Sequence, residues 1–263
     1  MYSLPTAPQP IGGVLADAMR LYRASFSRCW ILALVGALLD AIAGGYQTRS
    51  LSQLTALSPG DLLSQPLEEL SATLTNRIDL VLHSRSLWFS SLAMLLVWLL
   101  ICTALIQRQH AVAIAREEGI GAAVALSLRR MPSALTASIV SALLIVAGLL
   151  LLVVPGLWLG GMLQLWLVPL CIEDLGPLKA LGRSWQLVQR QWWHASTIVG
   201  VAVSIVAIVS MVADALPGAF LSALISLFTM PLLTAVMLSA YYDLRLRREG
   251  TLSAERPRPL QRA

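Results

Sequence analysis

Residue types that perform catalysis are sparse in this sequence. The three histidines, His83, His110 and His194, lie on different segments, and there is no HExxH, Walker A or GxSxG motif. Acid and base groups come near one another at a predicted membrane interface only with Glu173, Asp174 and His194. We interpret the histidines as solvated or interfacial side chains, and we predict no catalytic residue, cofactor or metal site.

Asp40 is the most informative single residue. In CWILALVGALLDAIAGGYQ it lies well inside an apolar run, near the bilayer midplane or slightly outward. Because a carboxylate at that depth costs about 2.5–3.5 kcal/mol, Asp40 is a candidate intramembrane polar site. Two interpretations stay open. Asp40 is either a functional group, or a structural one that contacts Ser or Thr of another helix or is exposed by helix tilt.

A basic, tryptophan-rich segment, LGPLKALGRSWQLVQRQWW at 175–193, separates two apolar runs. Its apolar and polar side chains recur at helical spacing on opposite sides, which predicts an amphipathic helix in the inner interface. The apolar side is Leu178, Leu181, Trp185, Val188 and Trp192. The candidate lipid headgroup contacts are Lys179, Arg183, Trp185 and Arg190, with the cations toward lipid phosphates. The alternative is an ordinary interface anchor.

Small residues gather at the start of a later apolar run. Gly156, Gly160 and Gly161 make a surface of the GxxxG type, which lets helices approach closely. We interpret this surface as helix packing within the protein, with a dimer interface as the alternative, and the oligomeric state stays undetermined.

The composition indicates that a bilayer surrounds these residues. The chain has 263 residues, of which 57% are hydrophobic and 13% charged, and its mean hydropathy is +0.74. Soluble domains carry roughly a quarter charged residues, so this chain cannot cover a water-facing surface. The cysteines, Cys29, Cys102 and Cys171, form no CxxC pair, which argues against a disulfide framework or a zinc site.

Six apolar runs are long enough to cross the roughly 30 Å of hydrocarbon as helices. They are about 28–47, 87–108, 134–154, 156–173, 194–215 and 218–241. Tight turns are expected at Pro155-Gly156 and at Leu216-Pro217-Gly218. The sequence therefore predicts an all-α membrane protein with six transmembrane helices.

Basic residues fix the expected orientation. With both termini in the cytoplasm, every Lys and Arg lies on the inner side except Arg49, Arg77 and Arg85. The N-terminus lacks the pattern of a cleaved signal peptide, so the first span is expected to act as an anchor. We expect a multi-pass protein of the bacterial inner (plasma) membrane. Its net charge of +5 lies beside apolar spans, so its expected partners are anionic lipids and not nucleic acid.

The basic segment has counterparts elsewhere in the chain. IGGVLADAMRLYRASF (11–26) and IGAAVALSLRR (120–130) also precede apolar runs. An ungapped alignment pairs Leu15 with Val124 and Leu181, Ala18 with Ser127 and Ser184, and Met19 with Leu128 and Trp185. Similar endings occur at REEG, EDLG and RREG. We predict three repeats, each with an interface helix followed by two membrane helices.

The remaining segments are assigned by composition. Residues 1–10 are expected to form a tail, 11–250 the membrane domain, and 251–263 a disordered basic tail. An external segment at about 48–86 contains PLEELSATLTNRIDLVL, which predicts an amphipathic helix.

Three motifs in this order resemble a known family: PG followed by an apolar run, ALGRSW, and YxDLRxRxEG. With IGGVLADAMRLYRASF upstream, the chain resembles bacterial integral membrane proteins related to the membrane domain of glycerophosphoryl diester phosphodiesterase, over about residues 11–250. The resemblance implies a multi-pass inner-membrane protein. The catalytic barrel of such enzymes needs about 250 further residues, and only 13 follow Gly250. No catalytic residue of the family has a position here.

These observations favour a non-enzymatic membrane protein that associates with lipids or acts as a scaffold for a membrane-protein partner. The first alternative is a small-solute transporter or channel that uses Asp40, although the spans offer few other polar groups than Gln164 and scattered Ser and Thr. The second is a lipid-modifying enzyme, which would need clustered acid and base groups at one interface.

Overall fold

The computed structural model describes residues 2–55, 75, 79, 83–214 and 219–250, and every regular element in these ranges is an α-helix. The helices are α1 (Ile11–Thr55), α4 (Arg85–Ala113), α5 (Ile120–Leu151), α6 (Val153–Leu163), α7 (Leu167–Ile172), α8 (Pro177–Val188), α9 (Trp192–Asp214) and α10 (Ala219–Glu249). Six segments are long and apolar enough to cross a membrane: Ile11–Ile42, Leu87–Ala113, Ile120–Leu151, Val153–Ile172, Trp192–Val212 and Ala223–Glu249. The predicted all-α membrane fold with six spans is confirmed. Most of the predicted external segment 48–86, the turn at 216–218 and the tail 251–263 lie outside the described residues.

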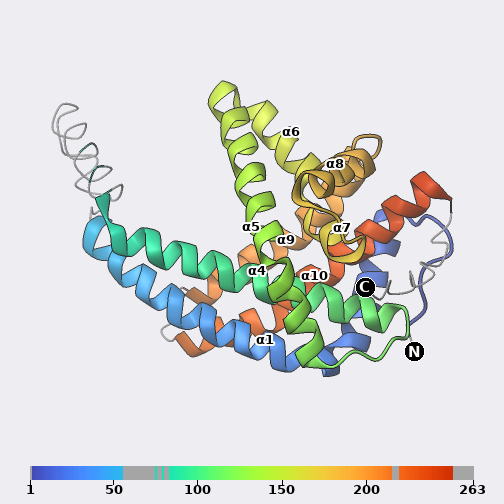
Figure 1. Cartoon of the computed structure of the whole chain (residues 1–263), viewed down its shortest axis with the longest axis horizontal. Helices are drawn as coiled ribbons and strands as arrows, with labels where there is room; N and C mark the ends of the chain where they lie inside the picture. Colours follow the sequence, from blue (N-terminus) through green and yellow to red (C-terminus); the bar gives the residue numbers. More distant parts are fainter. Residues whose placement is uncertain (1, 56–74, 76–78, 80–82, 215–218, 251–263) are drawn as a thin grey trace, which may run out of the picture.

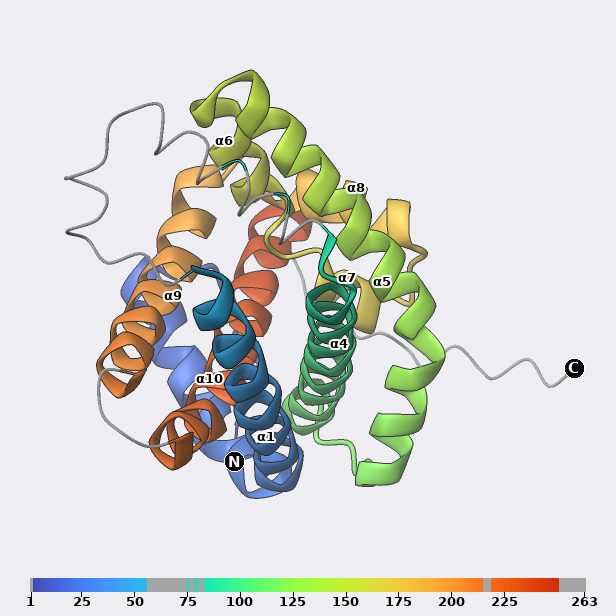
Figure 2. The ribbon, with the colours of Figure 1, turned by 90° about the vertical axis from the view of Figure 1, so that its left-hand side faces the viewer.

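The helices form a bundle from which one hairpin leans away. α1 and α4 run antiparallel and side by side, and α10 packs along α1 (Figures 1 and 2). α5 and α6 form a hairpin that rises steeply from this group (Figure 1). α1 begins and α10 ends at the same end of the molecule, where α8 also lies. The chain therefore crosses the apolar layer an even number of times.

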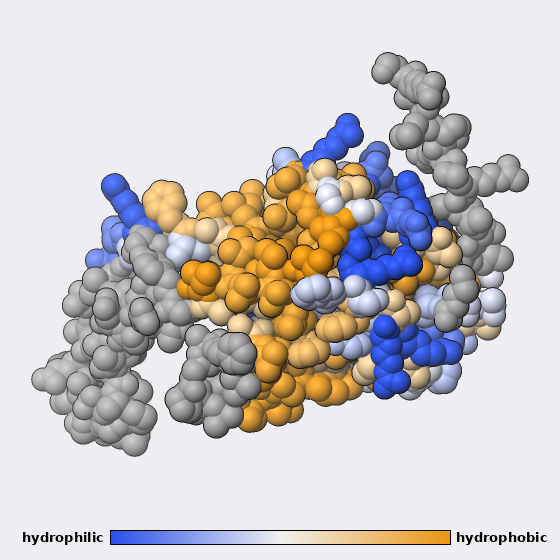
Figure 3. Space-filling model, turned by 90° about the horizontal axis from the view of Figure 1, so that it is seen from below, coloured by the Kyte–Doolittle hydropathy of each residue, from blue (hydrophilic) through white to orange (hydrophobic). Residues whose placement is uncertain are grey.

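The surface carries a broad apolar band, with most of the hydrophilic side chains at one end and a smaller group at the other (Figure 3). That end holds the start of α1 and the end of α10, and we call it the inner end. Large apolar side chains on the band are widely exposed, including Ile42 at 71%, Leu150 at 83% and Met211 at 76%. Such a continuous apolar surface requires hydrocarbon as its solvent.

The buried core lies toward the inner end. Its fully buried large side chains come from the first turns of α1, the second half of α4, the α6–α7 link, the first half of α9 and the second half of α10. They include Leu21, Leu105, Leu165, Ile198, Leu238 and Tyr241. The polar groups described below are therefore held by the most closely packed part of the protein.

Two predicted interface helices are not separate elements. Residues 11–26 are the first part of α1, and residues 120–130 are the first part of α5. No Gly or Pro interrupts residues 24–33, so the backbone hydrogen bonds of α1 continue into the span. Only α8 stands as a helix of its own among the three predicted interface helices.

The start of α1 also packs against protein. Val14, Ala18 and Leu21 are buried, and α1 packs there against α10 and not against lipid. The aligned residues Ala18, Ser127 and Ser184 all have 0% of their surface exposed, whereas Met19 and Leu128 at the next aligned position are 39% and 55% exposed. The threefold repeat itself stays a prediction.

The fourth predicted span is broken into α6 and α7. Trp166 N–H bonds to Leu163 O, and Val168 N–H bonds to Leu165 O, so the backbone tightens to bonds between residues three apart. Pro169 explains the break, because it lacks an N–H and its ring clashes with the carbonyl one turn earlier.

The turn between the third and fourth spans lies earlier than predicted. Leu152, with φ −164° and ψ 147°, links α5 to α6, and Pro155 and Gly156 lie inside the first turns of α6. Proline suits a first helical turn because the N–H that it lacks would have no partner there.

Candidate functional site

α8 lies at the inner end and buries one face against α5, α6, α7 and α10. Leu181 and Val188 are buried as predicted for the apolar side, whereas Leu178 is 69% exposed. The complete set of buried residues is Ala180, Leu181, Ser184, Leu187 and Val188. The prediction that lipid covers the apolar side of this helix is thus partly wrong. Neighbouring helices cover Leu181 and Val188, whereas Leu178 is exposed.

The four candidate headgroup contacts have different surroundings. Lys179 and Arg190 are exposed, whereas Arg183 and Trp185 are half-buried. Trp185 packs edge-on against Trp158 of α6, with ring centroids 5.0 Å apart. Of these four candidates, only Lys179 and Arg190 are therefore exposed.

Arg183 lies at the centre of an ion-pair network. Its Nε donates to both Glu173 carboxylate oxygens, at 2.9 Å to Oε1 and 3.0 Å to Oε2, and its Nη2 contacts Glu249. Tyr241 donates its hydroxyl to Glu173 Oε1 at 2.6 Å, and Arg245 Nε donates to Glu249 Oε2 at 2.8 Å. We call these five residues the Arg183 network. They join the α7–α8 link to the end of α10.

The network fixes the charge of Arg183. Burial lowers the pKa of Arg183, but its hydrogen bonds to Glu249 and Glu173 outweigh burial and raise the pKa above its ordinary value. The guanidinium therefore stays charged and is bound by two carboxylates of the same chain. A lipid phosphate would have to compete with both of them.

A second polar cluster holds the N-terminal segment against α10. Asp243, 2% exposed, accepts the Gln9 backbone N–H at 2.7 Å and Arg247 Nε at 2.7 Å. His194 Nε2 of α9 lies 2.9 Å from the same carboxylate. Three segments that are distant in the sequence thus meet at one buried acid.

The N-terminal segment is also bound to α1. The Tyr2 hydroxyl donates to Asp17 Oδ2 at 2.7 Å, and Arg20 Nη2 donates to Asp17 Oδ1 at 3.1 Å. Burial raises the pKa of Tyr2, and its hydrogen bond to Asp17 raises it further. Residues 2–10, predicted as a tail, therefore form part of the inner end.

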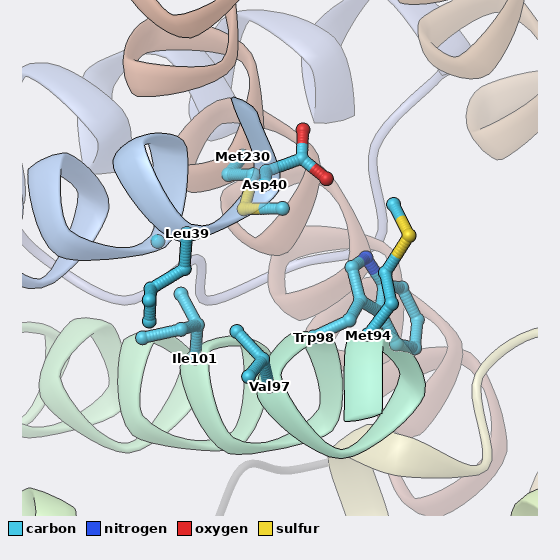
Figure 4. Close-up of a pocket in the computed structure, with 8 residues that line it drawn as sticks. Leu39, Asp40, Met94, Val97, Trp98, Ile101 and Met230 are labelled. Atoms are coloured by element: carbon cyan, nitrogen blue, oxygen red, sulfur yellow. The ribbon is translucent and has the colours of Figure 1, made fainter. Parts of the chain in front are cut away.

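Asp40 lies on α1 beside a shallow apolar hollow (Figure 4). The Ser226 hydroxyl of α10 donates to Asp40 Oδ2 at 3.2 Å, so a contact between helices is present, as one of the two interpretations expects. The side chain is half-buried, and its carboxylate points away from Val97 and Ile101 of α4.

The three candidate packing glycines differ in their contacts. A Cβ on Gly156 would lie 2.7 Å from the Leu149 backbone N, and a Cβ on Gly161 would lie 2.4 Å from Trp192 Nε1 and 2.9 Å from Ser196 Oγ. A Cβ on Gly160 would meet nothing within 4 Å. Gly156 thus permits the approach of α5, and Gly161 that of α9, whereas Gly160 faces open space.

The residues considered for acid–base chemistry have separate partners. Glu173 belongs to the Arg183 network, Asp174 Oδ1 lies 3.0 Å from Arg130 Nη2, and His194 contacts Asp243. Within the described residues, no group of three or more His, Cys, Asp or Glu side chains could hold a metal ion.

The other two histidines lie far from His194 in the sequence, and each has its own partner. His110 Nδ1 is 2.6 Å from the Tyr242 hydroxyl. His83 Nδ1 is 2.9 Å from the Asp79 carbonyl.

The contacts of several polar residues at the end of the predicted second span, about 87–108, were not predicted. The sequence QRQH at 107–110 lies at the inner end of α4, and its first three side chains are buried. Gln109 Nε2 donates to the Pro231 carbonyl at 2.7 Å, and Arg108 Nη1 donates to the Glu118 carbonyl at 2.9 Å. Four consecutive polar residues at the end of an apolar run were the available signal.

The partners of Arg183 and Asp243 were missed for another reason. Glu173 and Glu249 had been noted as parts of repeated acidic endings, but contacts across the sequence could not be inferred from them.

Comparison with known proteins places the chain in a family. Residues 30–242 match the family described as Domain of unknown function (DUF7847), and the chain belongs to that family. The matched range includes Asp40, Glu173, Arg183 and Tyr241 and excludes Asp17, Asp243 and Glu249. No curated protein and no solved structure matches the chain.

Proposed function

We propose that this member of the family is a non-catalytic protein of the bacterial inner membrane, which binds anionic lipids at its inner end and acts as a scaffold there. The observation that carries the proposal is the exposure of two cations, Lys179 near the start of α8 and Arg190 just after its end, which together we call the α8 basic surface. Each has an exposed apolar side chain close by in the sequence, Leu178 at 69% and Trp193 at 77%. Cations beside insertable apolar groups are the arrangement that binds anionic headgroups at an interface.

The proposal assigns lipid binding to only two of the four headgroup contacts that the sequence predicted. Arg183 is assigned to holding α8 on α10, because its guanidinium already contacts Glu173 and Glu249. Trp185 is assigned to packing on Trp158. Of the four candidates, Lys179 and Arg190 are the two expected to change lipid affinity without changing stability.

The inner end is assigned to the cytoplasm. The positive residues on loops and helix ends support this orientation, since cytoplasmic segments are enriched in Lys and Arg. Anionic lipids of the cytoplasmic leaflet would then face the α8 basic surface. Each Lys or Arg near such a surface contributes about 1 kcal/mol.

Native mass spectrometry or liposome flotation with phosphatidylglycerol tests the lipid claim. Replacing Lys179 and Arg190 together with Glu is expected to weaken binding of the purified full chain by at least about tenfold. Arg85→Glu is the matched control, because Arg85 is exposed near the opposite end of its span. Equal binding by the double variant and the unaltered protein would contradict the proposal.

We also propose that the chain is related to the membrane domain of glycerophosphoryl diester phosphodiesterase. Residues of the resembling motifs contact one another here, since Arg183 of ALGRSW binds Glu249 of YxDLRxRxEG. A structure of such a membrane domain without the corresponding Arg–Glu contact would count against the relationship.

A further inference from the structure

A hollow lies between α1, α4 and α10 and opens on the side of the protein (Figure 4). Its lining includes Leu39 and Asp40 from α1, Met94, Val97 and Trp98 from α4, and Met230 from α10. It is an open hollow on the side of the protein and not an enclosed cavity. Except for Asp40 and the indole N–H of Trp98, the named side chains are apolar.

The hollow faces hydrocarbon. Leu39 is 39% exposed and Trp98 is 41% exposed, and both belong to membrane-spanning segments. α1 and α4 approach closely at Gly36, where a Cβ would lie 2.9 Å from Ile101 Cγ2. A molecule dissolved in the bilayer can therefore enter from the side, and the close approach at Gly36 limits how far it passes between the two helices.

Asp40 gives this apolar hollow a single strong acceptor. A carboxylate can accept about four hydrogen bonds, and among the described residues Asp40 receives one, from Ser226 at 3.2 Å. In hydrocarbon, polar atoms without partners are costly, so a donor that reaches Asp40 from the bilayer would be strongly favoured.

We propose that this hollow binds a membrane amphiphile whose head, an amine or a hydroxyl, donates hydrogen bonds to Asp40. The first part of its chain lies over Leu39, Val97 and Met230, and the rest extends into the bilayer. Most ligand sites combine such an apolar lining with a few polar groups that fix orientation. An anionic head that carries no donor is disfavoured, because it offers no hydrogen bond to the Asp40 oxygens. The site therefore differs from the α8 basic surface in position and in the lipid class that it selects.

Photolabelling of the purified full chain in detergent tests the proposal. The probes are dodecylamine, dodecanol and dodecyl sulfate, each with a diazirine in the chain, and labelled peptides are identified by mass spectrometry. The amine, the hydroxyl or both should label the segments around Leu39 and Met94–Trp98, and the sulfate should not. Comparing the amine probe with the hydroxyl probe shows which of the two head groups the hollow binds.

Two variants separate the carboxylate from the hollow. Asp40→Asn is expected to lower labelling by the donor probes about tenfold, because one acceptor oxygen is replaced by an amide NH₂ group, which donates. Val97→Trp should lower it to a similar extent by filling the hollow, with Asp40 intact. Ser226→Ala is the control and should keep or increase labelling, since it removes a competing donor. Size-exclusion profiles and anionic-lipid binding at the α8 basic surface check that each variant is folded.

Two results would overturn the proposal. One is labelling that is equal for the amine and the sulfate. The other is labelling that is spread over all lipid-facing helices and unchanged in both Asp40→Asn and Val97→Trp.

Discussion

Arg183 and Arg190 come from the same basic segment, but their surroundings give them different roles. Arg183 is surrounded by Glu173 and Glu249, with its side chain 18% exposed, whereas Arg190 is exposed. Position on a helical wheel does not distinguish them. The distinction comes from α10, which returns to the inner end only after the last span.

Replacing Arg183 by Met should destabilise the protein, because it leaves Glu173 and Glu249 without their shared partner. The expected loss is about 1–3 kcal/mol of unfolding free energy. Thermal unfolding in detergent, followed by size-exclusion chromatography, measures it. Arg190→Met is the matched control on the same segment and should change stability by less than about 0.5 kcal/mol. An equal loss of unfolding free energy in the two variants would contradict the stabilising role proposed for Arg183.

At the residue scale, the sequence predicted candidates but not their partners. Asp40 could be identified because a charge in an apolar run is unusual, and Lys179 and Arg190 because they recur on one helical side. The Asp243 cluster could not be predicted, because Gln9, His194 and Arg247 meet there only after the chain has folded.

At the element scale, the glycines on α6 offer a graded test. Gly156→Ala and Gly161→Ala should each destabilise the protein by about 1–3 kcal/mol, since the added methyl groups would overlap α5 and α9. Gly160→Ala on the same helix should be neutral or slightly stabilising, because its side faces open space and Ala favours helix. Unfolding in detergent measures all three. The interpretation fails if Gly160→Ala is as harmful as Gly161→Ala.

The presence of each membrane helix could be predicted, but its ends could not. Length and hydropathy located all six spans because hydrocarbon requires closed backbone hydrogen bonding. The start of α1 was assigned to a separate helix because its amphipathic pattern changed, although nothing in residues 24–33 breaks a helix. The break between α6 and α7 could have been predicted from Pro169, but the prediction of this span used hydropathy alone, which does not register a proline.

At the scale of the whole molecule, the arrangement of charge makes a topology prediction. Alkaline phosphatase fused after Leu70 should be active, and a fluorescent protein fused to the C-terminus should fluoresce, because the basic inner end is expected in the cytoplasm. The reciprocal fusions serve as controls. An inactive phosphatase at Leu70 together with a dark C-terminal fusion would reverse the orientation and remove the basis of the lipid proposal.

The whole-molecule packing explains why the inner end carries the polar clusters. Most buried side chains lie there, whereas the outer parts of α5, α6 and α9 expose their apolar residues. A buried ion pair needs a closely packed surrounding to hold its geometry. The sequence could predict where the charges are, but only the three-dimensional packing shows which of them are enclosed.

One uninterrupted helix has a mechanical consequence for the membrane. α1 has 45 residues, which at 1.5 Å each gives a contour length of about 68 Å, more than twice the thickness of the hydrocarbon. The helix is continuous, but its first part, in dark blue, lies at a steep angle to the rest (Figures 1 and 2). This bend joins the membrane-spanning part to Asp17 and to the N-terminal segment that Tyr2 holds there, so a change in the tilt of the span would have to change the angle of the bend.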